Sequence, residues 1–203
     1  MDTNVFISGL KPGDPFHTDS RLLMTGMRNG EIRAETSALT VLEVASVSGR
    51  LYHSNRRPAG SEKERKVFVL RALKRLGELK IKFVNVAGDG PAPVKGIQAT
   101  LPSVFNEGLL LTLRSTLRTL DLIHVAAAKH ARLLNADLGA FVTGDREFLS
   151  NTDDLAAIVG MPIMSPREYL ATFAKSRPNR LRGGPVSGLV RAQRDERQKN
   201  LSR

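Results

Sequence analysis

Segments with the pattern of strands alternate with segments with the pattern of helices along most of this chain. Short apolar runs typical of buried strands lie at 81–86, 139–143 and 162–164, and another apolar run occupies 5–8. Helical patterns lie between them, at 17–28, 37–50, 61–80, 103–112 and 115–134. Alternation of this kind predicts a parallel sheet with helices on both faces. The sequence thus indicates the α/β class.

Four polar or glycine positions predict where two helices begin or end. Asn29-Gly30 closes the helix at 17–28. Ser37 is the expected N-cap of the helix at 37–50, and Gly49 is its expected end.

Charge divides the chain into two parts. The 203 residues carry a net charge of +11, and they include no cysteine, which excludes disulfides and thiolate metal sites. From Lys175 onward nine residues are positive and two are negative, with few apolar residues among them. We expect one domain over 1–173 and a basic, disordered tail over 174–203. A positive excess of this size suits a polyanionic partner such as nucleic acid.

The sequence predicts neither a membrane span nor a leader. No apolar run approaches the roughly 20 residues that cross a bilayer. The first residues, Met-Asp-Thr-Asn, lack the basic region of a signal peptide. A cytoplasmic location is therefore expected, without membrane contact.

Two acidic residues lie on helical stripes that are otherwise apolar. Asp121 shares its stripe with Leu117 and Val125, and Glu43 lies among apolar neighbours in 39–47. A buried carboxylate must be paired, neutralised or bound to metal, because its desolvation is costly. Pairing with an arginine, or a place at the edge of the stripe facing water, is the alternative for each.

Two further acids lie beside strand-like segments. Asp145 follows the run at 139–143 after a single glycine, and ligands of open α/β sheets bind at the carboxyl ends of strands. An ordinary Gly-Asp turn is the alternative for Asp145, and a simple helix cap is the alternative for Asp2.

The four acids together resemble the motifs of a known family. The segments Asp2-Thr-Asn-Val-Phe-Ile, Ser37 to Glu43, Leu120-Asp-Leu-Ile-His and Phe141-Val-Thr-Gly-Asp occur in the order of the four acidic motifs of PIN-domain ribonucleases, especially VapC-type toxins. The segment from Gly160 to Leu170 is similar to that family's closing strand and helix. The resemblance covers roughly residues 1–172.

The resemblance implies a three-layer α/β/α fold with a central, mostly parallel sheet of four to five strands. It implies that Asp2, Glu43, Asp121 and Asp145 are catalytic and hold Mg²⁺ or Mn²⁺, with Asn4 and Thr143 supporting the carboxylates. Oxygen ligands suit these hard cations. Metal-activated water would then hydrolyse an RNA phosphodiester, leaving a 5′-phosphate and a 3′-hydroxyl.

One departure from the family pattern concerns the first acid. In the family this aspartate closes a central strand, whereas only Met1 precedes Asp2 here. Either the strand begins upstream of Met1 or it is minimal.

Basic residues in and before the helix at 61–80 are candidates for RNA contact: Arg56, Arg57, Lys63, Lys66 and Lys74. A solvated helix face is the alternative. The resemblance also implies a homodimer, and an antitoxin bound near the same helix.

The function expected from these observations is a metal-dependent endoribonuclease, the toxin of a type II toxin–antitoxin pair. A housekeeping PIN nuclease for ribosomal-RNA processing and a catalytically inactive PIN-like module that binds RNA or protein are the alternatives.

Overall fold

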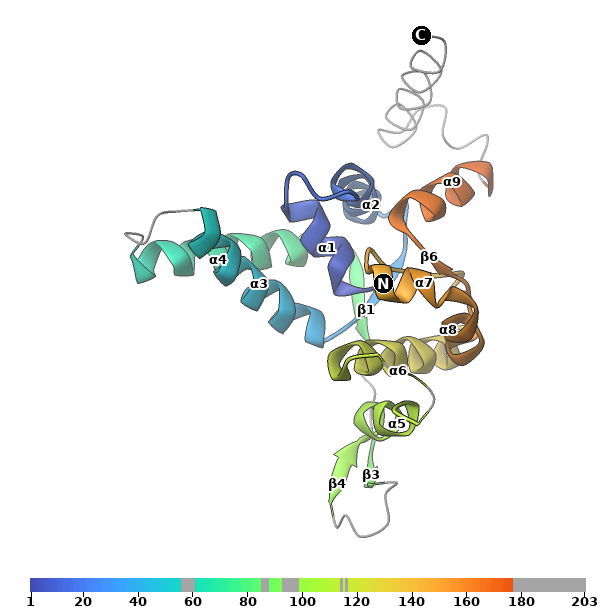
Figure 1. The fold of residues 1–203 in the computed structure, drawn as a ribbon. Coiled ribbons are helices and arrows are strands. Elements are labelled where there is room, and N and C mark those ends of the chain that lie inside the picture. Colours follow the sequence, from blue (N-terminus) through green and yellow to red (C-terminus); the bar gives the residue numbers. More distant parts are fainter. Residues whose placement is uncertain (56–60, 85–87, 93–98, 114, 116, 177–203) are drawn as a thin grey trace.

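A computed structural model describes residues 1–55, 61–84, 88–92, 99–113, 115 and 117–176 (Figure 1). Its helices are α1 (Thr3–Leu10), α2 (His17–Asn29), α3 (Leu39–Asn55), α4 (Glu62–Gly77), α5 (Ser103–Leu111), α6 (Thr119–Leu134), α7 (Arg146–Ser150), α8 (Thr152–Val159) and α9 (Pro166–Ser176). Its strands are β1 (Ala34–Ser37), β2 (Ile81–Val84), β3 (Asp89–Pro91), β4 (Thr100–Pro102), β5 (Phe141–Val142) and β6 (Ile163–Met164).

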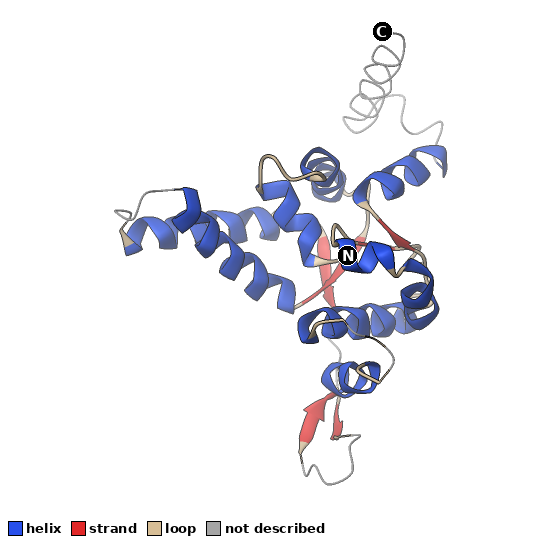
Figure 2. Ribbon diagram, in the orientation of Figure 1, coloured by secondary structure: helices blue, strands red, loops and turns tan. Residues whose placement is uncertain are grey.

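The strands form three pairs rather than one sheet (Figure 2). Strands β1 and β2 are parallel, with Ala34 opposite Ile81, and β5 and β6 are parallel, with Phe141 opposite Ile163. Strands β3 and β4 form an antiparallel hairpin. Parallel pairing within an α/β chain agrees with the sequence pattern. The expected central sheet of four to five strands is not formed by the residues that the structure describes.

The first two residues of the chain lie between the two parallel pairs. The α-amino nitrogen of Met1 donates to the carbonyl oxygen of Glu35 in β1 at 2.7 Å. The backbone N–H of Asp2 donates to the carbonyl oxygen of Val142 in β5 at 2.9 Å. Backbone hydrogen bonds of Met1 and Asp2 therefore connect β1 to β5.

The side chains form two apolar cores, one on each side of this junction. One core unites α1, α2, α3, α4 and β1, with Phe6, Leu23 and Met27 almost fully buried. The other unites α5, α6, α8 and the β5–β6 pair, with Phe148 and Leu155 at its centre.

Helix ends follow the sequence pattern in part. Gly30 ends α2 in the left-handed conformation, with φ of 77°, as expected. Helix α3, in contrast, continues past Gly49 to Asn55, so the expected end at Gly49 is wrong. The cost of about 1 kcal/mol for a glycine inside a helix is offset because Ser48 and Tyr52 are buried, with α3 packed against α4.

Several other boundaries differ from the expected ones. The apolar run at 5–8 belongs to α1, and α6 starts at Thr119 instead of 115. Helix α9 continues to Ser176, three residues beyond the expected domain boundary at 173. The helix packs against α2, where Arg167 pairs with the buried Asp19 at 3.1 Å. The tail from 177 onward lies outside the described residues.

No helix in the described part of the chain is both long and apolar enough to cross a membrane.

Candidate active site

All four predicted acids lie near the carboxyl ends of β1 and β5. Asp2 immediately precedes α1, and Glu43 lies in the second turn of α3, which follows β1. Asp145 follows β5 and is the N-cap of α7, and Asp121 lies in the first turn of α6. Elements that are distant in sequence therefore bring the four carboxylates into one region.

Asp2 and Asp145 are joined by two shared partners. The side-chain amide of Asn4 donates to Oδ2 of Asp2 and to Oδ2 of Asp145, at 3.2 Å in each case. Oγ1 of Thr143 donates to Oδ2 of Asp2 at 2.7 Å and accepts from the backbone N–H of Asp145 at 3.0 Å. Asn4 and Thr143 were both expected to support carboxylates, and the structure places them in contact with these two.

The carboxylate of Glu43 is held by two residues from other helices. Oγ1 of Thr3 donates to Oε2 of Glu43 at 2.5 Å, and Nε2 of His124 lies 2.6 Å from the same oxygen. Thr3 is itself hydrogen-bonded to Thr40, which is hydrogen-bonded to Thr36. Both contacts to Glu43 use Oε2, and neither uses Oε1.

The sequence analysis did not single out Thr3, and His124 entered it only as part of the motif that contains Asp121. The helical register carried some signal, because His124 lies three residues after Asp121 and Thr40 three residues before Glu43. Register alone could not show that His124 meets Glu43.

The pKa of Asp121 lies well above its ordinary value. Burial comes first and the nearby charges of Asp145 and Asp2 follow, and together they raise the pKa of Asp121 to about 6. Its neighbours on the predicted stripe, Leu117 and Val125, are buried, and the Asp121 side chain is half-buried. The charge of Asp121 is therefore disfavoured where it lies.

Burial also raises the pKa of Asp2, which is only 3% exposed, although His124 and the hydrogen bond from Thr143 oppose that rise. Burial would raise the pKa of Glu43 too, but the hydrogen bonds from His124 and Thr3 outweigh it and the pKa is lowered. Burial would lower the pKa of His124, and its bond to Glu43 together with the charge of Asp2 raises it instead. His124 is thus the cationic counterpart of Glu43 and Asp2.

The carboxylate oxygens of these side chains are suitable ligands for a divalent metal ion, although the described residues do not form a complete coordination site. Within the described residues, no group of three or more His, Cys, Asp or Glu side chains is arranged to hold a metal ion. Mg²⁺ does not require three protein ligands, because it keeps several water ligands and binds to the protein through one or two carboxylates. The donors are carboxylate oxygens, and the raised pKa values of Asp2 and Asp121 show that burial and mutual repulsion disfavour their negative charges, which a cation would offset.

Three of the predicted RNA contacts, Lys63, Lys66 and Lys74, lie on α4, which forms with α3 a hairpin that projects from the body (Figure 1). Lys63, Lys66 and Lys74 of α4 are exposed. Lys63 lies at the start of α4, near the connection from α3. The part of α3 from Glu43 to its end at Asn55 is roughly 18 Å long, at 1.5 Å per residue. Arg56 and Arg57 lie outside the described residues.

Comparison with known proteins gives one match. Residues 1–100 match the family model described as PIN domain, whereas no curated protein and no solved structure matches significantly. PIN domains have an α/β fold, are generally nucleases that need metal ions, and act on RNA. The matched range contains Asp2 and Glu43, while Asp121 and Asp145 lie beyond it. This match over the first 100 residues, which include two of the four acids, supports placing the chain in the PIN-domain family.

Proposed function

We propose that this protein is a divalent-metal-dependent endoribonuclease of the VapC type, with Asp2, Glu43, Asp121 and Asp145 as its catalytic and metal-binding carboxylates. The observation that carries the proposal is the meeting of these acids at one edge of the fold. Asn4 and Thr143 link Asp2 to Asp145. The charges of Asp2 and Asp145 act on Asp121, and the charge of Glu43 acts on Asp2.

Asp2, Asp121 and Asp145 would hold Mg²⁺ or Mn²⁺, and Glu43 would contribute directly or through water. The bound ion supplies a water nucleophile at neutral pH and Lewis-acid stabilisation of phosphoryl charge. Asn4 fixes one oxygen of Asp2 and one of Asp145, so that the two carboxylates keep a constant separation. Thr3 and His124 fix Oε2 of Glu43, and neither of these contacts uses its other oxygen, which would be the one to bind metal or water. The products would be a 5′-phosphate and a 3′-hydroxyl.

The direct test is cleavage of total RNA by the full chain, with Mg²⁺, with Mn²⁺ and in excess EDTA, followed by mapping of the cut ends. Asp145→Asn should abolish cleavage, because it removes charge from one of the two carboxylates that Asn4 bridges. Asp154→Asn is the matched control, since Asp154 is an exposed acid on α8. Equal cleavage in EDTA, or full cleavage by Asp145→Asn, would contradict the proposal.

The toxin role extends this proposal to a cytoplasmic protein with an antitoxin partner and a dimeric state. The surface of the α3–α4 hairpin favours binding to a protein partner, because the apolar side chains of Leu42, Phe68 and Leu70 are exposed there among basic residues. Induced expression in a bacterium should arrest growth, and Asp145→Asn should not. Co-expression of a small DNA-binding protein encoded beside the gene should restore growth. Arrest by both forms would exclude cleavage as the cause, and a housekeeping nuclease would cause no arrest.

A further inference from the structure

Three arginine side chains gather around a cavity that is lined by residues of α1, α2 and the last turn of α4. Its volume is about 370 Å³. Arg21 and Arg28 of α2 and Arg75 of α4 line it, together with His17 at the start of α2. None of the described residues that line it is acidic. This cavity, which we call the arginine cavity, therefore offers positive charge to a ligand.

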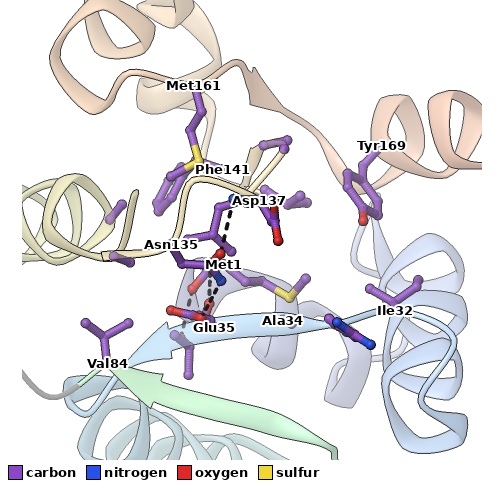
Figure 3. Close-up of a pocket in the computed structure, with 18 of the residues that line it drawn as sticks. Met1, Ile32, Ala34, Glu35, Val84, Asn135, Asp137, Phe141, Met161 and Tyr169 are labelled. Carbon is purple, nitrogen blue, oxygen red and sulfur yellow. Dashed lines mark hydrogen bonds between the residues drawn. The ribbon is translucent and has the colours of Figure 1, made fainter. Parts of the chain in front are cut away.

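The larger cavity between β1 and β5 has the opposite charge balance. Its volume is about 510 Å³. Glu35 and Asp137 line it together with Arg33 and with apolar side chains such as Phe141 and Met161 (Figure 3). Acidic residues outnumber arginines in its lining, so that a polyanion is disfavoured there. The arginine cavity is the better candidate for an anionic ligand.

Two of the three arginines have no partner within the described part of the chain. The side chains of Arg21 and Arg75 are exposed and form no hydrogen bond or ion pair there. Arg28 lies 3.7 Å from Glu78, but both side chains are about half exposed, and such pairs contribute little. A helix C-terminus attracts Arg28 and Arg75, which lie in last turns, but it does not account for Arg21 in the second turn of α2. Arg21 and Arg75 are thus available to an external anion.

The cations of α2 form a line rather than a single point. His17, Arg21 and Arg28 share one stripe of the helix, at spacings of four and seven residues. From His17 to Arg28 the helix rises roughly 16 Å, at 1.5 Å per residue. A free phosphate could contact only part of this line, whereas a polynucleotide carries one phosphate for each nucleotide. Guanidinium groups bind phosphate oxygens through two parallel hydrogen bonds. The arrangement therefore fits a phosphodiester backbone better than a small anion.

Helix α1 connects the arginine cavity to the acidic site. Gly9, near the C-terminal end of α1, lines the cavity, and Nδ1 of His17 lies 2.8 Å from the carbonyl oxygen of Ser8. Asn4, in the first turn of the same helix, bonds to two of the four carboxylates. From Asn4 to Gly9 the helix rises roughly 8 Å. An RNA strand whose scissile phosphate lies at the carboxylates can therefore continue along α1 into the cavity.

We propose that the arginine cavity binds backbone phosphates of the RNA substrate beside the scissile bond, with Arg21 and Arg75 as the main contacts. The proposal rests on the proposed nuclease function. Contacts of this kind fix the position of the strand and do not read its bases. The cavity would thus hold RNA of any sequence along α1.

The test measures binding of a labelled single-stranded RNA oligonucleotide to the full chain in EDTA. Arg21→Ala combined with Arg75→Ala, the cavity pair, should lower the affinity about tenfold or more. It should also flatten the log–log salt dependence by about 1.4, at about 0.7 for each phosphate contact. Arg33→Ala combined with Lys175→Ala is the matched control, because it removes the same charge from exposed residues outside the arginine cavity. The control should lower the affinity less than about threefold.

A charge-conserving variant separates the contact from the fold. Arg21→Lys combined with Arg75→Lys should retain most of the affinity, because lysine also binds phosphate. Both arginines are exposed, so the cavity pair should keep the melting temperature of the wild type. Inorganic phosphate should displace the RNA no better than chloride at equal ionic strength.

Three outcomes would overturn the proposal. Equal losses of affinity in the cavity pair and the control would assign the effect to net charge. Displacement of the RNA by inorganic phosphate, at ionic strengths where chloride has no effect, would make the cavity a site for a free anion. Unchanged binding by the cavity pair would contradict the cavity alone, whereas a wild-type chain that binds no RNA would contradict the nuclease function as well.

Discussion

Nε2 of His124 lies 2.6 Å from Oε2 of Glu43, and this contact joins α6 to α3 across 81 residues of sequence. His124 is 3% exposed and the Glu43 side chain is 25% exposed. The pair connects α3 and α6, which belong to different apolar cores, so its protonation affects both the stability of the fold and the position of a carboxylate that we propose to be catalytic.

The stability of this pair should depend on pH. A histidine with a raised pKa stabilises the fold fully below its ordinary value of 6.5, and the effect is lost as pH rises through the raised pKa. A glutamate with a lowered pKa stabilises the fold above 4.5, and the effect is lost as pH falls through the lowered pKa. His124→Ala should therefore lower the free energy of unfolding by about 1–3 kcal/mol, and this loss should be largest between about pH 4.5 and 6.5. Urea melts from pH 4 to 9 measure this. His124→Gln, which keeps a donor without the charge, is the control, and a loss independent of pH would contradict the ion pair.

Asp121→Asn should abolish cleavage yet stabilise the metal-free protein. The pKa of Asp121 is raised to about 6, so its ionisation destabilises the fold, and this penalty grows from pH 3.8 to about 6 and is constant above. Because solvent screens the charge of a half-buried group, Asp121→Asn should raise the free energy of unfolding by only about 1–2 kcal/mol at pH 7.5, and by nearly zero at pH 4. The gain should shrink in Mg²⁺, because bound metal stabilises the wild type. Thermal melts in EDTA and in Mg²⁺ are the measurement. A mutant less stable than wild type in EDTA would mean that Asp121 is paired with a cation.

Thr143→Val should weaken the site because it removes a hydroxyl. The side chain is fully buried, and its oxygen serves both Asp2 and the backbone of Asp145. The isosteric valine removes both hydrogen bonds and should cost about 1–3 kcal/mol of stability. It should also lower Mn²⁺ affinity by roughly 10–100-fold, as observed when partners of metal ligands are removed. Titration calorimetry and melts check this, and Thr143→Ser should retain most of the affinity. Unchanged Mn²⁺ binding by the valine variant would show that Thr143 does not orient Asp2.

Truncation after Ser176 should reduce RNA affinity without affecting cleavage chemistry. The removed segment, 177–203, has eight positive and two negative residues, whereas α9 remains intact. For every phosphate that the tail neutralises, its removal should flatten the log–log salt dependence of binding by about 0.7 for single-stranded RNA. Lys63→Ala combined with Lys66→Ala tests the hairpin in the same assay. An unchanged salt slope after truncation would assign the tail another purpose.

The sequence predicted the elements of this fold better than their assembly. Helical stripes identified α2 and α4, and the apolar runs identified β2, β5 and β6, because these patterns are local. The end of α3 could not be predicted from Gly49, since burial of Tyr52 against α4 outweighs the local cost of glycine. Met1 and Asp2 connect β1 to β5 through hydrogen bonds to Glu35 and Val142, which are far away in sequence, and no local pattern predicts such contacts.

For the acidic site too, the sequence predicted the positions of residues within their helices but not the contacts between helices. The positions of Glu43 and Asp121 at the border of buried stripes followed from helical spacing. The partners of Glu43 could not be inferred, because Thr3 and His124 reach it from separate helices. A spacing rule applies within one helix, and these contacts depend on how three helices pack.

The amide of Asn4 that bonds to Asp145 joins residues 141 positions apart. A ribosome adds about 5–20 residues per second, so roughly 7 to 30 s separate the synthesis of these two residues. During that interval Asp2 and Asn4 have left the ribosome while their partners Val142, Thr143 and Asp145 do not yet exist. The acidic site therefore assembles only after residue 145 has been added to the chain, and the ribosome and messenger that produce the chain are not exposed to the complete site before then.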